Sequence, residues 1–560
     1  MPGTVAAICV VLAVTVLAAL YRPRRGAGGG PGRARPVSAP TAAMALGDEY
    51  LSGALIVGFA CLVLVSGARS LWLGVGALAG FVVMLALVAA PLRRSGAYTL
   101  SDFTEWRLRS RKVRRFASAC VCFAAWVYLL PQFQGVGLTL TAGTGAPPWA
   151  GVVIVLGVVV LAVASGRARS MTAGQAVQFW VKLVAVIVPV FTILALTGGR
   201  PADDAAARFT QRTDVRPAQN VAIHVVAPVT VTADGRVDGV RRDGPLRLAP
   251  GRHVLGGNAR VSFPAGAPVP HAERVRGEPP AAGSRAHGLF GVYSLLAAMI
   301  LGTMGLPYLV LRLYSVPSAR AVRRTLLGGL GLLALFLLLP PVYGSLGRVA
   351  GMEPALSGWP DGTILDIPDR LLSGAPAHVA TALLVAGVFC AFVSATTAIV
   401  LAVASTISQC LLGGGVHSFR VGALIAVAVP LALMPVVGSV SAGVVVPYAF
   451  AIAAASLCPL LLLGTWWRRL TGAGAAAGMA AGGGATVLCF VAYVAGGPWH
   501  GWLADVVTYP AVATVPFGFA VMIGVSLLTP RMVPEGTGAA MARMHLPEAL
   551  VGVAAVRREV

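Results

Sequence analysis

Long apolar segments alternate with short polar ones along almost the whole chain. A membrane-spanning helix needs about 20 mainly apolar residues, and thirteen segments of this sequence meet that requirement. They lie near residues 4–20, 36–66, 71–92, 117–143, 149–165, 171–197, 288–314, 324–346, 376–410, 421–440, 444–465, 472–496 and 510–529. The pattern therefore predicts an all-α polytopic membrane protein with about 13 transmembrane helices.

Composition and charge agree with a lipid bilayer as the surroundings. Of the 560 residues, 57% are hydrophobic and only 11% are charged, which lies outside the usual range for soluble proteins. The net charge of +23 arises in short connections between spans, so it sets topology and predicts no nucleic-acid partner. Counting spans places five basic clusters on one side, at residues 21–35, 107–115, 166–169, 312–324 and 466–470. We expect that side to be the cytoplasm of a bacterial cell, with the chain in the plasma membrane, its N-terminus outside and its C-terminus inside.

The spans divide into a core with additions at both ends. We expect residues 1–35 to form an extra N-terminal helix and a basic inner loop, residues 36–465 a ten-helix core, residues 466–529 two further helices and residues 530–560 a cytoplasmic tail. No positive charge precedes the apolar residues 4–20, and arginines follow them directly. This arrangement favours an uncleaved span over a signal peptide.

One connection is far longer than the others and interrupts the core on the outer face, from residue 198 to residue 286. Its stretch VAIHVVAPVTVTADGRV alternates apolar and polar positions before a series of Gly and Pro turns. This pattern predicts a few strands. The high proline content leaves a disordered insertion as the alternative.

The sequence indicates no enzymatic chemistry. All eight cysteines lie in apolar spans, which indicates neither a disulfide framework nor a zinc site. The chain has no Walker A pattern, so if it transports a solute, we do not expect ATP to drive that transport. No nucleophile and base pattern or metal-ligand cluster recurs in the spans, so we expect no enzymatic activity and no cofactor.

Two adjacent acids, Asp48 and Glu49, stand in an otherwise apolar span. If they capped a helix at the cytoplasmic surface, that helix would run from Leu51 to Ser66, which is 16 residues. Such a helix is about 24 Å long, against about 30 Å of hydrocarbon, so the span must begin upstream and the acids lie inside the membrane. A helix broken at mid-membrane, which exposes carbonyls and a helix N-terminus to a cation and an anionic solute, is the favoured interpretation. The interfacial cap is the alternative.

Two other spans carry polar side chains at helical spacing. Ser394, Thr397, Ser405 and Ser408 lie near one face of the span 376–410. Such hydroxyls either ligate a small cation or bond to their own helix and its neighbours. Thr172, Gln175 and Lys182 share one face of the span 171–197. Lys182 lies about 16 Å from the cytoplasmic end of that span, and a lysine at this depth needs a carboxylate or a lowered pKa. A fixed structural pair is the alternative.

Glycine and proline indicate where further helices are kinked or interrupted. Pro131 and Gly135 can kink the span 117–143 and expose Gln132 and Gln134. The stretch GTMGLPY, residues 302–308, surrounds Thr303 with two glycines and a proline. It is the second candidate for a broken helix and lies five helices after the first, which is the separation expected of a pair of five-helix repeats.

At this point the sequence resembles the sodium:solute symporters, and within them the cation/acetate symporter group of actinobacterial type. The resemblance covers nearly all of the chain except residues 198–286. It is carried by DEYLSGALIVGFA, APLRRSGAYTLSDFTEWRLRSRKVRR, MTAGQAVQFWVKL and GTMGLPYLVLRLYSVPSARAVRR. The resemblance implies an inverted five-helix repeat with broken first and sixth core helices, alternating access, and sodium as the coupling ion.

The resemblance also implies where the ion and the solute bind. The ion would lie between the first and eighth core helices, at carbonyls near Asp48, Leu51 and Ala391 and at the hydroxyl of Ser394, while Thr397 on the same face is a further candidate. The family usually has a second hydroxyl after the first, and here that position is Ala395. The solute, a small carboxylate such as acetate, would lie beside the breaks, at Tyr50, Ser52, Gln132 and Thr303.

Three classes of function remain open from the sequence. The first is a sodium-driven symporter for a small monocarboxylate, with a proton-coupled variant in which Glu49 or Lys182, beside Gln175, takes up and releases the proton. The second is a sensor that kept the fold and lost turnover, although the short tail leaves no room for a fused signalling domain. The third, a membrane-embedded enzyme, has no supporting pattern. The substrate and the oligomeric state are not indicated.

Overall fold

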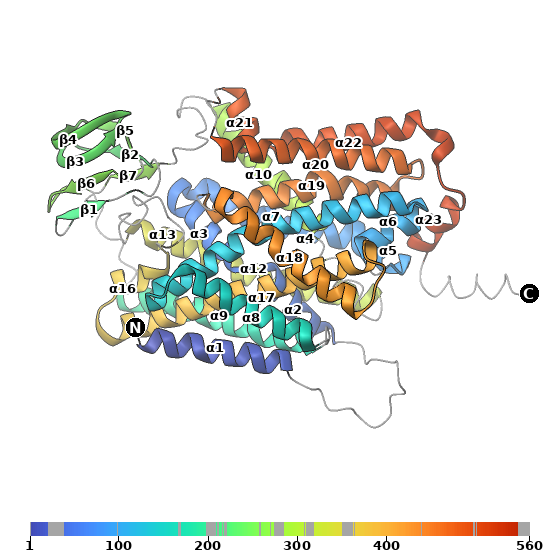
Figure 1. Ribbon diagram of the computed structural model, residues 1–560, viewed down its shortest axis with the longest axis horizontal. Coiled ribbons are helices and arrows are strands. Elements are labelled where there is room, and N and C mark those ends of the chain that lie inside the picture. The colour runs from blue at the N-terminus through green and yellow to red at the C-terminus, as the bar shows by residue number, and fades with distance from the viewer. Residues whose placement is uncertain are drawn as a thin grey trace, which may run out of the picture.

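The computed structural model is a helical bundle with a small β-sheet beyond one end of the helices (Figure 1). It describes residues 2–546 apart from residues 21–37, 98, 166–169, 198–208, 210–211, 216, 218–220, 257–258, 269, 274–284, 307–308, 310–318, 350–361, 363, 438–439, 497–498 and 500. Within these residues, nine helices are long and apolar enough to cross a membrane, and one bent pair passes the same test together. Three shorter apolar helices coincide with the remaining predicted spans. The predicted fold class is confirmed.

Most of the long helices follow the predicted apolar segments to within about six residues, and short helices lie between them. They are α1 (Pro2–Leu20), α2 (Ala39–Tyr50), α3 (Gly53–Ser66), α4 (Leu71–Val83), α5 (Ala89–Ser95), α6 (Leu100–Leu108), α7 (Arg111–Thr144), α8 (Pro148–Ser165), α9 (Ser170–Thr197), α10 (Arg285–Gly305), α12 (Ala319–Leu337), α13 (Leu339–Val349), α16 (Ile367–Leu371), α17 (Gly374–Cys410), α18 (Val416–Val437), α19 (Ala442–Trp466), α20 (Gly472–Ala495), α21 (Trp502–Thr508), α22 (Ala511–Leu528) and α23 (Thr537–His545). All eight cysteines carry free thiols.

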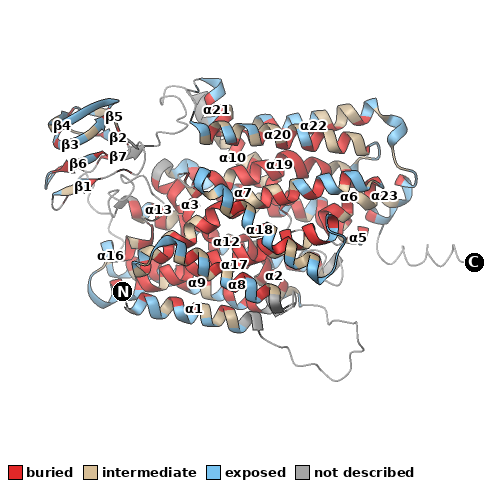
Figure 2. Cartoon of the chain, viewed as in Figure 1, coloured by how far each residue is buried: buried red, intermediate tan, exposed pale blue. Residues whose placement is uncertain are grey.

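The centre of the bundle is formed by α17 and α19, which are buried along almost their whole length (Figure 2). Small residues let other helices approach them closely. A Cβ on Gly302 of α10 would lie 2.4 Å from the carbonyl oxygen of Phe450 in α19, so only glycine fits there. Such close packing of small residues is how helices associate inside lipid, where burial of apolar surface gives little driving force.

The first core helix is broken, as predicted. Helices α2 and α3 meet at an angle of 57°, with Leu51 and Ser52 between them. Ser52 caps α3, because its Oγ accepts a hydrogen bond of 3.1 Å from the backbone N–H of Leu55. Asp48 and Glu49 lie in the last turn of α2 and are buried, so the interfacial cap is wrong.

The second predicted break is described only in part. Helix α10 ends at Gly305, inside the stretch 302–308 where the interruption is predicted. Residues 307–308 and 310–318 lie outside the described residues, and so do parts of the basic cluster and of the sequence stretch that carries the resemblance there. The next described helix, α12, begins at Ala319.

The long insertion contains a β-sheet, which confirms the predicted strands. They are β1 (Thr213–Val215), β2 (Val221–Val225), β3 (Val229–Val237), β4 (Val240–Leu248), β5 (Gly251–Leu255), β6 (Arg260–Phe263) and β7 (His271–Glu273). All pairs are antiparallel, in the order β1-β6-β3-β5-β2-β7, with β4 paired to β3. Alternate residues of β3, from Val229 to Ala233, are buried, as the alternating pattern requires.

Candidate functional site

Three helices meet at the break between α2 and α3. Helix α9 packs against α2 and α17, and small residues bring the helices together. A Cβ on Gly47 of α2 would lie 3.0 Å from the ring of Phe179 in α9. A Cβ on Gly387 of α17 would lie 2.4 Å from the Cβ of Ala185 in α9. Lys182 lies on α9 between these two contacts and is therefore held against the broken helix.

Lys182 binds the end of α2 at three oxygen atoms. Its Nζ lies 2.7 Å from Oδ1 of Asp48, in an ion pair whose two side chains are fully buried. The same Nζ donates hydrogen bonds to the backbone carbonyls of Asp48, at 2.9 Å, and of Leu51, at 3.3 Å. These are two of the carbonyls that the family resemblance assigns to sodium. The residues present therefore do not fit a sodium ion at these carbonyls while the ammonium lies there.

The neighbouring acid is also paired with α9. Gln175, two turns before Lys182 on the same face, donates a hydrogen bond of 3.0 Å from Nε2 to Oε1 of Glu49. Both side chains are buried. The structure thus joins the acid pair to the predicted polar face of α9. The side chain of Thr172, the third member of that face, lies outside the described residues.

On the α17 side of the predicted ion site, the hydroxyls make hydrogen bonds to their own helix or to the turn that follows it. Ser394 Oγ donates to the carbonyl of Ala391 at 3.4 Å, and Thr397 Oγ1 donates to the carbonyl of Val393 at 2.8 Å. Ser405 bonds within α17 to Ala402, and Ser408 reaches the carbonyl of Gly415. These bonds are of the kind that serine and threonine commonly make to their own helix or the adjoining turn.

Three of the four residues predicted to bind solute make hydrogen bonds between helices beside the break. Tyr50 and Thr303 share a hydrogen bond of 3.1 Å between their hydroxyls, which links α2 to α10. Ser52 shares one of 2.8 Å with the hydroxyl of Tyr128 on α7. Both tyrosine rings contact Phe450 edge-on, so these hydroxyls lie at the edge of an aromatic cluster. Tyr128 was not predicted, although it lies four residues before Gln132 and therefore on the same helical face.

Gln132 lies one turn beyond Tyr128 on α7, and its side chain is the unpaired member of the predicted solute residues within the described part of the chain. Its side chain is fully buried, and neither Oε1 nor Nε2 has a hydrogen-bond partner among the described residues. Leaving a buried polar group unsatisfied costs about 1–3 kcal/mol. By contrast, Gln134 is partly exposed and donates to the carbonyl of Val437 at 3.4 Å. Of the two glutamines beside Pro131, Gln132 is the one whose amide remains available to a ligand.

Phe392 closes the region between α3 and α7. A Cβ on Gly53 would lie 2.4 Å from Cγ of this ring, and one on Gly135 would lie 2.1 Å from its Cζ. The ring therefore fits only because both facing positions are glycine. The site is compact, with aromatic side chains on several sides and the N-terminus of α3 at its edge.

A model of the sodium:solute symporter family matches residues 34–234 and 282–482. The chain belongs to this family. It is 27% identical to an uncharacterized symporter of Cupriavidus necator over 595 aligned positions, which cover 88% of this chain and 86% of that protein. The family match covers both the broken helix and the helices that pack on it. The protein is therefore a multi-pass membrane protein of a family of solute symporters.

Two solved symporter structures share the fold of this family member. A Na⁺-coupled sialic acid symporter in a substrate-bound, outward-open state matches with a TM-score of 0.60 and 12% identity, over 94% of this chain and 97% of that one. A transporter of the nucleobase-cation-symport-1 family, closed with bromovinylhydantoin bound, matches with a TM-score of 0.50 and 11% identity, over 93% of this chain and 99% of that one. At these identities the likeness supports the helical fold alone.

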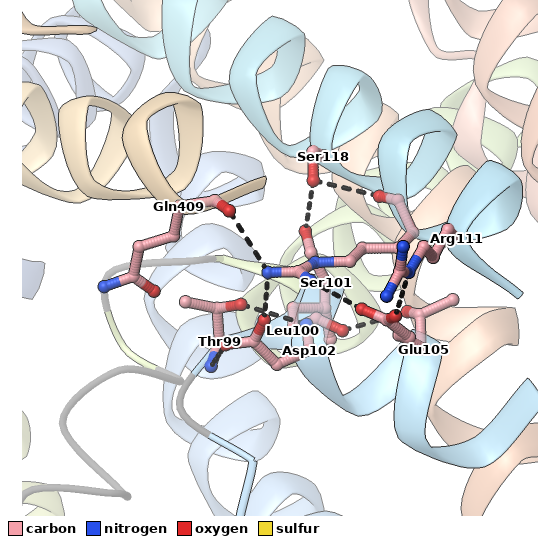
Figure 3. Close-up of polar contacts among 10 residues, drawn as sticks. Thr99, Leu100, Ser101, Asp102, Glu105, Arg111, Ser118 and Gln409 are labelled. Carbon is pink, nitrogen blue, oxygen red and sulfur yellow. Dashed lines mark hydrogen bonds and ion pairs between the residues drawn. The ribbon is translucent and has the colours of Figure 1, made fainter. Parts of the chain in front are cut away.

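In this symporter, a charged cluster joins the corner between α6 and α7 to the Cys410 end of α17 (Figure 3). Arg114 pairs with Asp102 at 2.8 Å and with Glu105 at 2.5 Å. It also donates a hydrogen bond of 3.3 Å to the carbonyl of Gln409, where a cation suits the end of a helix. Thr99 and Asp102 form a capping box that holds α6 in place. The cluster therefore anchors the helix that carries Ser394.

Replacing Arg114 with methionine is expected to destabilise the protein by about 1 kcal/mol. The effect is small because Arg114 and the acids it pairs with are partly exposed, although its guanidinium contacts three acceptors. We expect the apparent melting temperature of the purified protein, followed by tryptophan fluorescence, to fall by a few degrees. Arg111→Met is the matched control, because Arg111 is 89% exposed and its nearest contact to Glu105 is 3.6 Å. Equal losses in both variants would show that the cluster has no anchoring role.

Proposed function

We propose that this family member is a secondary active symporter that couples the inward movement of a cation to the uptake of a small monocarboxylate such as acetate, by alternating access. The solute binds beside the break between α2 and α3, at Tyr50, Ser52, Gln132 and Thr303. The observation that carries the proposal is the buried amide of Gln132, which has no hydrogen-bond partner among the described residues.

The chemistry of the break suits an anion. The first N–H groups of a helix have no partner within the helix, and the helix dipole favours negative charge at that end. The Nε2 of Gln132 and the hydroxyl of Tyr128 add donors. A carboxylate would satisfy these groups without needing a buried basic residue of its own.

The packing around the break suits a small solute. Phe392 lies against both Gly53 and Gly135, and the ring of Tyr50 packs on Phe81 with their centroids 4.9 Å apart. These aromatic side chains leave the polar groups at the edge of a closely packed region. A small carboxylate fits such a region better than a sugar or a nucleobase does.

The coupling ion follows from two different observations. Membership of the sodium:solute symporter family suggests sodium. Proton coupling on the same fold is the second candidate, because the ammonium of Lys182 lies on two of the carbonyls that sodium would need. A sensor that lost turnover would share the solute site but would not carry solute, and transport measurements separate it from both.

Solute counterflow tests the class of solute without any ion gradient. Liposomes containing the purified protein are loaded with unlabelled acetate and diluted into labelled acetate, and protein-free liposomes measure leakage of the neutral acid. We expect transient accumulation that pyruvate and propionate inhibit and that acetamide, of similar size but uncharged, does not. Inhibition by acetamide as strong as by propionate would contradict recognition of the carboxylate.

Replacing Gln132 with methionine is expected to raise the KM for the carboxylate about tenfold or more, because a hydrogen bond to a charged group contributes about 1.5–3 kcal/mol. Gln178→Met is the matched control. Gln178 is also buried on the helical bundle, but its amide donates to Thr15 at 3.1 Å, away from the break. An unchanged KM in the Gln132 variant, with normal amounts of protein in the membrane, would remove this residue from the solute site.

A further inference from the structure

Lys182 lies where the family resemblance would place the coupling ion. Its Nζ is within 3.3 Å of the carbonyl oxygens of Asp48 and Leu51 and within 2.7 Å of the Asp48 carboxylate. These are oxygen ligands at the end of a broken helix, which is where secondary transporters bind cations. The ammonium therefore makes contacts that resemble those of a bound ion.

Lys182 already places a positive charge beside Asp48. Both side chains are fully buried and form an oppositely charged pair. The other acid in this turn, Glu49, accepts a hydrogen bond from the uncharged amide of Gln175. A sodium ion on the same carbonyls would lie within a few ångströms of the ammonium. At that separation in the protein interior, two like charges repel by several kcal/mol.

The set of hydroxyls that would complete a sodium site is also smaller by one. Ser394 donates to the carbonyl of Ala391 and keeps its oxygen lone pairs, but the next position is Ala395, whose side chain has no oxygen. The chain thus has a tethered cation on one side of the site and one hydroxyl fewer on the other. Both features weaken a sodium site at this point, and they lie on different helices.

The choice of lysine is notable in this sequence. Only two of the 43 basic residues are lysines, Lys112 and Lys182, and the other 41 are arginines. A lysine ammonium is a compact point charge on a flexible stem, whereas a guanidinium is broad and planar. Among the basic side chains, only lysine matches the size and charge of a monovalent ion in a narrow site.

We propose that the ammonium of Lys182 serves as a built-in cation in place of sodium, so that this symporter does not bind sodium between α2 and α17. The absence of sodium binding is independent of the proposed symport, and only the role of this site in transport rests on that function. The tethered charge holds the end of α2 against α9. Sodium binds there only when Lys182 is removed.

Sodium binding to the purified protein tests this directly and requires no solute. Radioactive ²²Na⁺ binding is measured at pH 7 with choline as the replacement cation, for the wild type and for Lys182→Met, Lys182→Arg and Lys112→Met. We expect Lys182→Met to bind at least about ten times as much sodium as the wild type does at the same sodium concentration. We also expect the melting temperature of this variant to rise with sodium concentration. Lys182→Arg keeps the positive charge and should therefore also bind no sodium at this point. Lys112→Met changes an exposed lysine and should behave as the wild type does.

The expected result would show that the position of the Lys182 ammonium can bind sodium once the ammonium is removed. If Lys182→Met does not fold, the double variant Asp48→Asn with Lys182→Met keeps the site neutral and should bind sodium in its place. The proposal is overturned if the wild type binds sodium and Ser394→Ala abolishes that binding. It is also overturned if neither Lys182→Met nor the double variant binds more sodium than the wild type. Because no carboxylate is present, these outcomes are independent of whether the protein carries one.

Discussion

Replacing Asp48 with alanine should destabilise the protein by about 3–5 kcal/mol, because it leaves the ammonium of Lys182 buried without its carboxylate. This is the largest single effect that the structure predicts, since both side chains of the pair are fully buried. The expected result is a marked loss of folded protein in the membrane and of monodisperse protein after purification. Fluorescence-detected size-exclusion chromatography of a tagged variant measures both.

Two comparisons make this result specific to the charge pair. Asp48→Leu combined with Lys182→Met replaces both partners with apolar groups of similar volume, and we expect it to restore most of the folded protein. Asp243→Ala removes an exposed acid of the insertion and should have no effect. If Asp48→Ala alone folds as well as the wild type, the pair does not have the structural role assigned to it.

Replacing Gly135 with alanine should reduce transport by about tenfold or more, because the added methyl group would lie 2.1 Å from the ring of Phe392. The ring must then move toward the break, where Gly53 leaves it no space. Gly157→Ala on α8 is the matched control, since nothing lies within 4 Å of a Cβ there. Initial uptake rates, normalised to the amount of protein in the membrane, give the comparison.

A second substitution tests the cause of that loss. Phe392→Leu in the Gly135→Ala background removes part of the ring that the methyl group displaces, so it should recover part of the lost rate. Equal loss of transport in Gly135→Ala and Gly157→Ala would show that the effect comes from helix packing in general and not from the break.

The sequence predicts helices and the break well because both depend on local properties. Apolar length identifies the spans, and the short distance from Leu51 to Ser66 already requires a span that begins before the acids. Likewise, spacing places Gln175 and Lys182 on one helical face. The depth of Lys182 in its span predicts that it needs a carboxylate, and the structure shows this partner to be Asp48.

The parts that the sequence does not predict depend on which helices meet. Phe392 lies between Gly53 and Gly135, which are 82 residues apart, and no periodicity links the three positions. The contact of Lys182 with the carbonyls of α2 is also invisible in the sequence, because a backbone oxygen has no residue type. These contacts change the interpretation of the ion site, from one that sodium fills to one that a side chain fills.

Uptake of labelled pyruvate into liposomes that contain the purified protein, under a sodium gradient alone and then under a proton gradient alone, separates the two coupling ions. Pyruvate is a stronger acid than acetate, so less of it crosses the bilayer unaided, and protein-free liposomes measure that leakage. We expect accumulation above equilibrium under the proton gradient, unchanged when choline replaces sodium. Failure to accumulate any monocarboxylate under either gradient would contradict the proposed symport, and a strict requirement for sodium would contradict the built-in cation.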